Sequence, residues 1–519
     1  MRTLRNLGRG WRIVRTLGAH DATYILDRLD LPGWLHWLAK AVAGRARPDF
    51  AAQRPGQRLA AAVQAMGPSF IKFGQTLSTR ADIVGEEIAA DLALLRDRLP
   101  PFPTAQALAV IESELDHPIH ELFASFEQTP VAAASIAQVH FAVTVDGEPV
   151  AVKVLRPGIE DDFERDIDFF LWGAELLERF VEPARRLEPV KVVKTFKRSV
   201  SEELDLRLEG AAASEMAESF AGDPTFKIPD VDWRRTQCRV LCTERVEGIP
   251  IADRAALLAA GRNLDRVVDN LLTAFLNQAF RDGFFHADLH HGNLFVGADD
   301  GIIAVDFGIM GRLDDSERRY VGAMLLAFLT GDYRRAAEVH FQAGYVRRDQ
   351  SVESFAQALR AIAKPVFDRP PADVSMGKLL AHLFAVTEQF RMRTQPQLLL
   401  LQKTLVVVEG ICRELAPHKD LWATARTWLR NWLPQAMGLA AQAQSGAEEL
   451  LATVRRLPGL IEAAERAGAS FTPEGLKLLP PDALSPSLGG SRRTFNGNRV
   501  LMYGLTLVLL VYVVFTSIG

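Results

Sequence analysis

Residues 286–293 read HADLHHGN, and residues 306–308 read DFG. Asn293 follows Asp288 by five residues, and Asp306 follows Asn293 by thirteen. Phosphoryl transfer depends mainly on positioning and on neutralising charge. Asp288 would orient or deprotonate an attacking hydroxyl group or water, and Asn293 and Asp306 would hold Mg²⁺, which prefers oxygen ligands. The spacing therefore predicts a site that acts on ATP phosphates; the simpler alternative is a capped turn with solvated acids.

Three histidines in the same segment, His286, His290 and His291, raise the alternative of zinc. A zinc site needs histidines at a regular spacing together with a further ligand. This segment is expected to be a loop between strands, and its Asp and Asn residues already account for it. We therefore favour magnesium, and we expect His286 to orient the loop through hydrogen bonds to the backbone.

A β-hairpin is predicted upstream of this loop. Residues 138–145 and 150–155 are rich in β-branched residues, and the turn 146–148 has the Asp-Gly sequence typical of hairpins. Lys153 lies in the middle of the second strand, where kinases place the lysine that grips ATP phosphates. The Ala-rich residues 132–137 form the loop that enters the first strand.

Such a lysine needs an acidic partner. Glu203, Asp205 and Glu209 all fall in one predicted helical run, residues 201–210. The sequence does not distinguish among the three acids, and a charged, exposed helix face explains the run equally well.

Two further motifs complete a recognisable set. Lys72-Phe73-Gly74-Gln75 has the form Lys-x-Gly-Gln, and Glu203-Leu204-Asp205 has the form Glu-x-Asp. With the motifs above, they resemble the UbiB family of atypical kinases, associated with coenzyme Q (ubiquinone) biosynthesis, over about residues 60–415. The resemblance implies an α+β, protein-kinase-like bilobed fold with extra N-terminal helices and a C-terminal transmembrane helix.

The resemblance also implies roles for individual residues. The Ala-rich loop replaces the Gly-rich loop of protein kinases and has less backbone freedom, which the family links to altered nucleotide preference and suppressed protein-kinase behaviour. Residues 243–248 resemble the hinge beside the adenine, and the segment carrying Lys72 would fold over the site and occlude a protein substrate. Asp288 and Lys153 are the predicted catalytic residues, and Asn293 and Asp306 the predicted metal ligands. The predicted nucleotide-binding residues are Val131, Ala132, Ala133, Ala134, Ser135, Ile136, Ala137, Gln138, Val139, Lys153, Glu244 and Val246, and the regulatory family-motif residues are Lys72, Gln75, Glu203, Asp205 and Glu209.

Composition excludes several other classes of protein. The chain has 519 residues, 48% of them hydrophobic, and a formal net charge of -4. These values are typical of a folded protein of several domains and give no support for a nucleic-acid partner. The three cysteines are too few for a disulfide framework, and we interpret them as reduced thiols.

Both ends of the chain have a sequence that suggests contact with a membrane. Residues 1–20 contain five arginines and no acid, which fits either an amphipathic helix on an anionic bilayer or a solvated helix packed on the protein. Residues 500–518 contain no charge and are long enough to span a bilayer. Arg492, Arg493 and Arg499 precede this span, so we expect a single anchor in the inner (cytoplasmic) membrane with the main body in the cytoplasm.

The predicted organisation has six parts: a basic N-terminal helical segment (1–60), an extension with the Lys-x-Gly-Gln motif (61–120), a kinase-like N-lobe (121–250), a helical C-lobe with the catalytic loops (251–440), a linker (441–499) and a transmembrane anchor (500–518). The expected function is a membrane-anchored atypical kinase or ATPase that supports ubiquinone biosynthesis with ATP (or ADP) and Mg²⁺. Membrane lipids, lipid-soluble quinone precursors and other ubiquinone biosynthesis proteins are the expected partners. The alternative is a nucleotide-binding scaffold or chaperone of a quinone biosynthetic complex with little catalysis.

Overall fold

The protein is described by a computed structural model in which the chain forms two units, residues 1–437 and 438–519. In the second unit the described strands are β12 (Phe471–Thr472) and β13 (Gly475–Leu476), which pair antiparallel. The predicted anchor at 500–518 lies outside the described residues, and no described helix is both long and apolar enough to cross a membrane. The residues described are 2–24, 41–43, 47–50, 53–78, 84–92, 95, 99–180, 185, 188–347, 349–367, 390, 396–432, 471–472 and 475–476.

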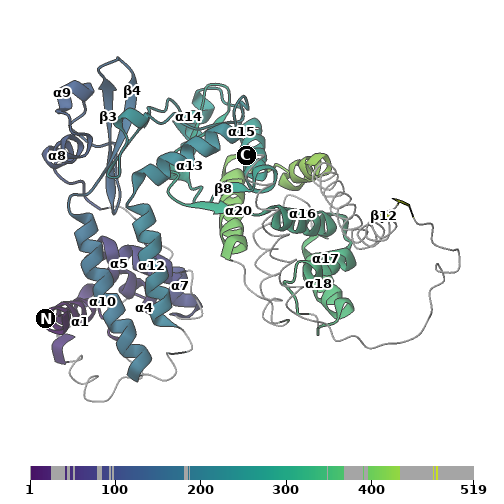
Figure 1. Ribbon diagram of the computed structural model, residues 1–519, viewed down its shortest axis with the longest axis horizontal. Coiled ribbons are helices and arrows are strands. Elements are labelled where there is room, and N and C mark those ends of the chain that lie inside the picture. Colours follow the sequence, from purple (N-terminus) through teal and green to yellow (C-terminus); the bar gives the residue numbers. More distant parts are fainter. Residues whose placement is uncertain are drawn as a thin grey trace. The chain divides into compact units, whose positions relative to one another are not determined.

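An antiparallel sheet carries Lys153. Its strands follow the order β1 (Phe123–Phe126), β3 (Ala137–Thr144), β4 (Pro149–Leu155) and β6 (Val240–Glu244), and the short β2 (Ala132–Ala133) pairs with β3. Figure 1 shows β3 and β4 side by side. The hairpin predicted between β3 and β4 is confirmed, with Gly147 at a φ of 89° that glycine adopts easily.

The alternation of β4 explains which way its lysine points. Val152 and Val154 are fully buried and pack with Ile111 of α8 (Thr104–Leu115) on one face of the sheet. Side chains alternate between the two faces of a strand. Lys153 therefore projects from the opposite face.

A group of helices packs together through aromatic side chains. α5 (Pro68–Ser78) packs against α10 (Ile159–Phe180) and α12 (Pro189–Glu203), which run side by side (Figure 1). Phe73 of α5 stacks on Phe170 of α10 with ring centroids 4.5 Å apart and meets Phe196 of α12 edge-on. The same group includes α1 (Arg2–Ala19), α4 (Pro55–Met66) and α7 (Glu86–Leu92).

The helical run expected over residues 201–210 is wrong. α12 ends at Glu203, and a new helix, α13 (Leu206–Ser219), begins after Asp205. The Asp205 carboxylate accepts a hydrogen bond from the backbone N–H of Arg207 and caps the new helix. Aspartate favours this N-cap position because it satisfies a backbone donor that has no partner within the helix. The three candidate acids consequently lie on different elements.

The C-terminal part of the first unit is mainly helical and surrounds short strands. α15 (Leu264–Leu276) is buried along its length and leads into the π-helical turn η3 (Asn277–Asp282). The strands predicted near residue 300 are observed as an antiparallel pair, β9 and β10. The remaining elements are β5 (Phe226–Lys227), β7 (Ile249–Pro250), α14 (Arg254–Ala259), β8 (Phe284–His286), η4 (His291–Asn293), β9 (Leu294–Val296), β10 (Ile302–Ala304), β11 (Met310–Arg312), α16 (Asp315–Thr330), α17 (Tyr333–Gln342), α18 (Val352–Phe367) and α20 (Pro396–Leu415).

Candidate active site

Lys153 forms an ion pair with Glu209, which resolves the three alternatives that the sequence left open. The Lys153 Nζ donates to both carboxylate oxygens of Glu209, at 2.7 and 2.9 Å. The exposed fractions of the two side chains are 18% and 9%. Because α13 begins at Leu206, Glu209 lies in its first turns and faces β4.

Asp306 is the second anionic neighbour of Lys153. Its Oδ1 lies 3.2 Å from the Lys153 Nζ, although the residues are 153 positions apart. Asp306 has a φ of 66°, a left-handed conformation uncommon for residues other than glycine, Asn and Asp. This conformation precedes Phe307, which is buried against the His286 ring. The backbone of Asp306 is thus held in an unusual state at the place where its carboxylate meets Lys153.

The charges in this cluster perturb one another. Burial would lower the pKa of Lys153, but Asp306 and Glu209 together raise it above its ordinary value, so that the lysine stays charged. The Asp306 side chain is half-exposed to solvent, and the neighbouring Lys153 charge lowers the pKa of Asp306 below its ordinary range. Burial, assisted by Asp306 and opposed by Lys153, raises the pKa of Glu209 to about 7. Perturbed groups that cluster in this way are typical of functional sites.

The backbone brings Asn293 next to Asp306. The N–H of Val305 donates to the carbonyl of Asn293 at 2.9 Å, one residue before Asp306. The Asn293 side chain donates from Nδ2 to the carbonyl of Asp288 at 3.3 Å, and its Oδ1 has no hydrogen bond among the described residues. The structure thus places the Asn293 side chain against the backbone of Asp288, and the Asn293 backbone beside the residue that precedes Asp306.

His286 orients the loop as predicted. It is fully buried, and its Nδ1 accepts a hydrogen bond from the backbone N–H of Asp288 at 3.1 Å. Burial lowers the pKa of His286, which fits a neutral imidazole with an accepting nitrogen. The backbone N–H of His286 itself donates to Gln278 in the π-helical turn η3, at 3.1 Å. The start of the loop is thus fixed from a buried element of the C-terminal core.

The chemistry of the donors fits magnesium better than zinc. Asn293 and Asp306 supply an amide oxygen and a carboxylate, which suit a hard cation that keeps several waters or phosphate oxygens in its shell. The histidines have separate partners: the His290 Nδ1 accepts from the N–H of Gly292, and the His291 Nε2 lies 2.9 Å from the Glu414 carboxylate. No group of three or more His, Cys, Asp or Glu side chains suited to a metal occurs in the part of the chain that the structure describes.

The Ala-rich loop is a short strand followed by a tight turn. Ala132 and Ala133 form β2, and the N–H of Ala134 donates to the carbonyl of Ala137 at 2.8 Å. Arg156 holds this turn, because its guanidinium donates to the Ala134 carbonyl at 2.9 Å and its N–H donates to the Ile136 carbonyl at 2.8 Å. The sequence analysis did not single out Arg156. Only its position directly after the strand of Lys153 could have drawn attention to it.

The other predicted nucleotide-binding residues differ in what their side chains contact. Gln138 is buried and bonds the backbone of Phe102 through both ends of its amide, so its side chain points toward the N-terminal extension. Glu244 ends β6 and pairs with Lys227 at 2.7 Å, and Val246 lies half-buried in the segment between β6 and β7. The remaining predicted loop residues have these positions: Val131 is exposed before β2, Ser135 and Ile136 are buried in the turn, and Ala137 and Val139 lie in β3.

The predicted family-motif residues form a second ion pair beside the first. The Lys72 Nζ lies 2.5 Å from the Glu203 carboxylate, so α5 reaches the end of α12 close to the site. Gln75, one turn further along α5, donates to the carbonyl of Leu95 at 3.3 Å. Asp205 caps α13 and pairs with Arg207 at 2.7 Å. Of the three candidate acids, only Glu209 contacts Lys153, and the other two have other partners.

A cation that the sequence analysis did not predict contacts Asp288. The Lys403 Nζ of α20 donates to the Asp288 Oδ1 at 3.0 Å. The exposed fractions of the two side chains are 56% and 33%. Lysine is common on exposed helix faces, and Lys403 follows Asp288 by 115 residues, so no local sequence signal marked it.

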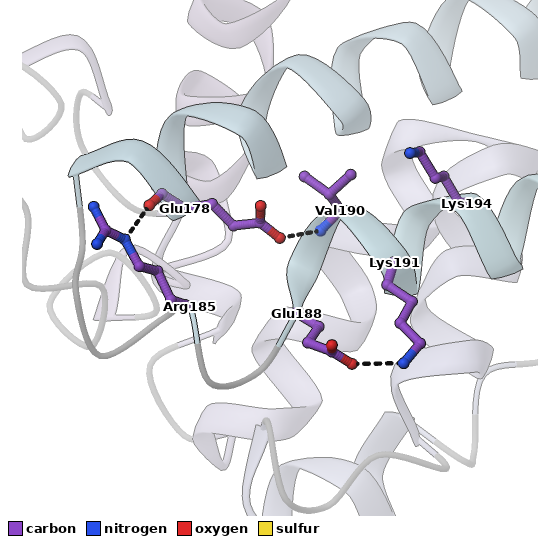
Figure 2. Close-up of a pocket in the computed structure, with 6 residues that line it drawn as sticks. All are labelled: Glu178, Arg185, Glu188, Val190, Lys191 and Lys194. Atoms are coloured by element: carbon purple, nitrogen blue, oxygen red, sulfur yellow. Dashed lines mark hydrogen bonds and ion pairs between the residues drawn. The ribbon is translucent and has the colours of Figure 1, made fainter.

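A separate hollow lies where α10 ends and α12 begins (Figure 2). It has a volume of about 550 Å³ and is lined mainly by charged side chains. Figure 2 shows Glu188 paired with Lys191, at 2.8 Å, and the Glu178 carboxylate accepting from the N–H of Val190, at 3.1 Å. No predicted site residue lines it, so we do not assign the nucleotide to this hollow.

Comparisons with known proteins show which family the chain resembles. Residues 94–340 match the family model of the ABC1 atypical kinase-like domain, and residues 359–420 match that of the UbiB helical domain. The probable protein kinase UbiB of Marinobacter nauticus is 45% identical over 387 residues, which cover 74% of this chain and 71% of the relative. The probable protein kinase UbiB of Azotobacter vinelandii is 41% identical over 443 residues, which cover 84% and 82%.

A solved structure supports the fold alone. The complex of Rv3197 with erythromycin from Mycobacterium tuberculosis aligns with a TM-score of 0.51 at 24% identity. The alignment covers 68% of this chain and 90% of that chain. The predicted kinase-like fold of mixed helices and sheets is therefore confirmed, whereas its predicted transmembrane helix falls outside the described residues.

Proposed function

Because the chain belongs to the UbiB family of ABC1 atypical kinase-like proteins, we propose that it binds ATP or ADP with Mg²⁺ and cleaves the terminal phosphate of ATP in support of ubiquinone biosynthesis. The observation that carries this proposal is the contact of Lys153 with both Glu209 and Asp306. It joins the strand that would hold the phosphates to the acid that would hold the metal. Because two carboxylates hold the Lys153 ammonium in position, it can donate hydrogen bonds to phosphate oxygens from a fixed place.

Each residue of the site has a separate task in this proposal. Asn293 and Asp306 would hold Mg²⁺, which neutralises phosphate charge when bound. Asp288 would take the proton of the attacking hydroxyl group or water on its carboxylate. His286 and Gln278 fix the backbone of this loop, so that Asp288 approaches the nucleophile from a constant direction.

The lipid-soluble character of quinone precursors supports a role at the membrane. We propose that residues 500–518 anchor the protein in the inner membrane with the main body in the cytoplasm. A tethered enzyme meets a prenylated precursor in the same bilayer at a high effective concentration. Removing residues 499–519 should release the protein into the soluble fraction. Retention of the truncated protein on membranes would instead favour the basic helix α1 as the anchor.

The Ala-rich loop would set the preference between ADP and ATP. Ala133 lies in β2, where a methyl group restricts the backbone more than glycine does. Ala133→Gly should therefore change the ratio of the two dissociation constants, measured by calorimetry with Mg²⁺ present. Identical ratios in the wild type and the variant would count against this role of the loop.

The test of the proposed function compares catalysis with scaffolding. Nucleotide hydrolysis is measured with and without lipid vesicles for the wild type and for Asp288→Asn, and quinones and their intermediates are profiled in cells carrying each form. The proposal expects Asp288→Asn to lose hydrolysis and to accumulate an intermediate. Normal quinone levels in cells that carry the inactive variant would support the scaffold alternative.

A further inference from the structure

α20 contacts the catalytic loop at two points. Lys403 donates to the Asp288 carboxylate at 3.0 Å, and the Glu414 carboxylate lies 2.9 Å from the His291 Nε2. The two α20 residues are eleven positions apart, which is close to three helical turns, so they project from the same face. One helix therefore lies along the whole loop from Asp288 to His291.

The helix that supplies these contacts is firmly held. Val408, Ile411 and Cys412 are fully buried in the C-terminal core, and α20 packs on α15. The Arg254 guanidinium also donates to the carbonyl of Leu415 at 3.2 Å. The backbone of α20 that carries Lys403 is consequently held against the core.

Lys403 has no acid within one turn of it on its own helix. The positions three and four residues away on each side are Leu399, Leu400, Val406 and Val407. Among the described residues, Asp288 is the one carboxylate paired with Lys403. His290 is the other basic group near Asp288, with its Nε2 3.9 Å from the Oδ2.

The ion pair between Lys403 and Asp288 is too exposed to contribute much to the stability of the fold. Exposed ion pairs contribute about 0–1 kcal/mol, because water screens the charges and both side chains lose freedom. Here Lys403 is 56% exposed and Asp288 is 33% exposed. The partner of Lys403 is nevertheless the carboxylate to which we assign proton transfer, and it belongs to the ABC1 match at 94–340, whereas Lys403 belongs to the UbiB helical match at 359–420.

We infer that Lys403 is a positioning residue for the phosphoryl-transfer reaction: it holds the Asp288 carboxylate turned toward the nucleophile. The inference rests on the proposed function. Lys403 thereby makes the helical domain part of the site around Asp288. No described residue of the ABC1 match donates a hydrogen bond to the Asp288 carboxylate. Small errors in the placement of a catalytic group reduce rates by about a hundredfold.

The test uses the full-length protein and steady-state hydrolysis of Mg-ATP. Lys403→Met removes the charge and keeps the length of the side chain, Lys403→Arg keeps the charge, and Lys364→Met is the matched control on the exposed face of α18. We expect Lys403→Met to lower kcat by about tenfold to a hundredfold, with KM and the nucleotide dissociation constant within about twofold of the wild type. Lys403→Arg should recover part of kcat, and Lys364→Met should match the wild type.

A double variant distinguishes this inference from the proposed function. In the Asp288→Asn background, Lys403→Met should cause no further loss, because the carboxylate that it positions is absent. If Asp288→Asn is inactive while Lys403→Met has the kcat of the wild type or a higher one, the positioning role is wrong and the proposed function stands. Hydrolysis that is absent in the wild type, or that survives Asp288→Asn, would refute the proposed function and this inference with it.

Discussion

The Lys153 ammonium lies within 2.9 Å of both carboxylate oxygens of Glu209 and 3.2 Å from the Asp306 Oδ1. These contacts connect a strand, a helix and a loop that are far apart in the sequence. The exposed fraction of Glu209 is 9%, so its carboxylate depends on the lysine for a partner. Replacing Lys153 or Glu209 should therefore affect folding as well as the binding of nucleotide.

Glu209→Gln should lower the affinity for Mg-ATP about tenfold and the free energy of unfolding by about 1–3 kcal/mol, because Lys153 loses a buried charged acceptor. Glu202→Gln is a matched control, since Glu202 is exposed at the end of α12 and has no ion pair among the described residues. Calorimetric titration and thermal unfolding measure the two effects. Equal affinities for the two variants would refute the pairing of Lys153 with Glu209.

Asp288→Asn should lower kcat for hydrolysis by about 10²–10⁴-fold, the usual contribution of a general base. The nucleotide dissociation constant should stay within about twofold, because Asp288 contacts neither Lys153 nor Asp306. Asp299→Asn, at an exposed position in the turn between β9 and β10, provides the control and should keep the wild-type rate. A rate for Asp288→Asn within threefold of the wild type would contradict its assignment as the base.

The pair between Lys72 and Glu203 predicts a charge-reversal experiment. Lys72→Glu and Glu203→Lys should each lower the melting temperature, because each places two like charges about 2.5 Å apart. The double variant should recover most of the loss, with a coupling energy of about 0.5–3 kcal/mol. Additive losses in the double variant would show that the two side chains do not interact in solution.

His340 predicts how stability depends on pH. Burial lowers the pKa of His340 from 6.5 to about 4, and its ring packs against Phe355. Between these values the unfolded chain binds the proton more tightly than the folded protein does. Stability should therefore fall as the pH drops from about 6.5 to about 4, by up to about 3 kcal/mol from this residue. His340→Leu should flatten this part of the curve of unfolding free energy against pH, and an unchanged slope would contradict the prediction.

The sequence predicted the centre of the site better than its surroundings. Asp288, Asn293 and Asp306 could be singled out because they follow one another at short spacings, and Lys153 because it lies in the middle of a predicted strand. The partner of Lys153 could not be chosen, because an acid-rich run looks like one continuous helix, whereas α12 ends at Glu203 and Asp205 caps the next helix. This break separates Glu203, which pairs with Lys72, from Glu209.

Sequence patterns did not predict contacts between elements that are far apart along the chain. Lys403 belongs to no motif that the sequence offers, and only the packing of α20 on the core brings it to Asp288. Arg156 supports the Ala-rich turn through backbone carbonyls, which no side-chain motif reveals. The sequence identifies the side chains that could take part in catalysis, but the tertiary fold determines which of them are in contact.

The binding of adenine nucleotide with and without Mg²⁺, followed by calorimetry in the wild type and in Asp306→Asn, tests the central claim most directly. The wild type should bind ATP much more tightly with Mg²⁺ than without it. In Asp306→Asn, the ratio of the ATP dissociation constants without and with Mg²⁺ should be at least about tenfold smaller, because a carboxylate ligand of the metal is missing. Failure of the wild type to bind adenine nucleotide, or an equal effect of Mg²⁺ on both proteins, would contradict the assignment of this cluster as a nucleotide site.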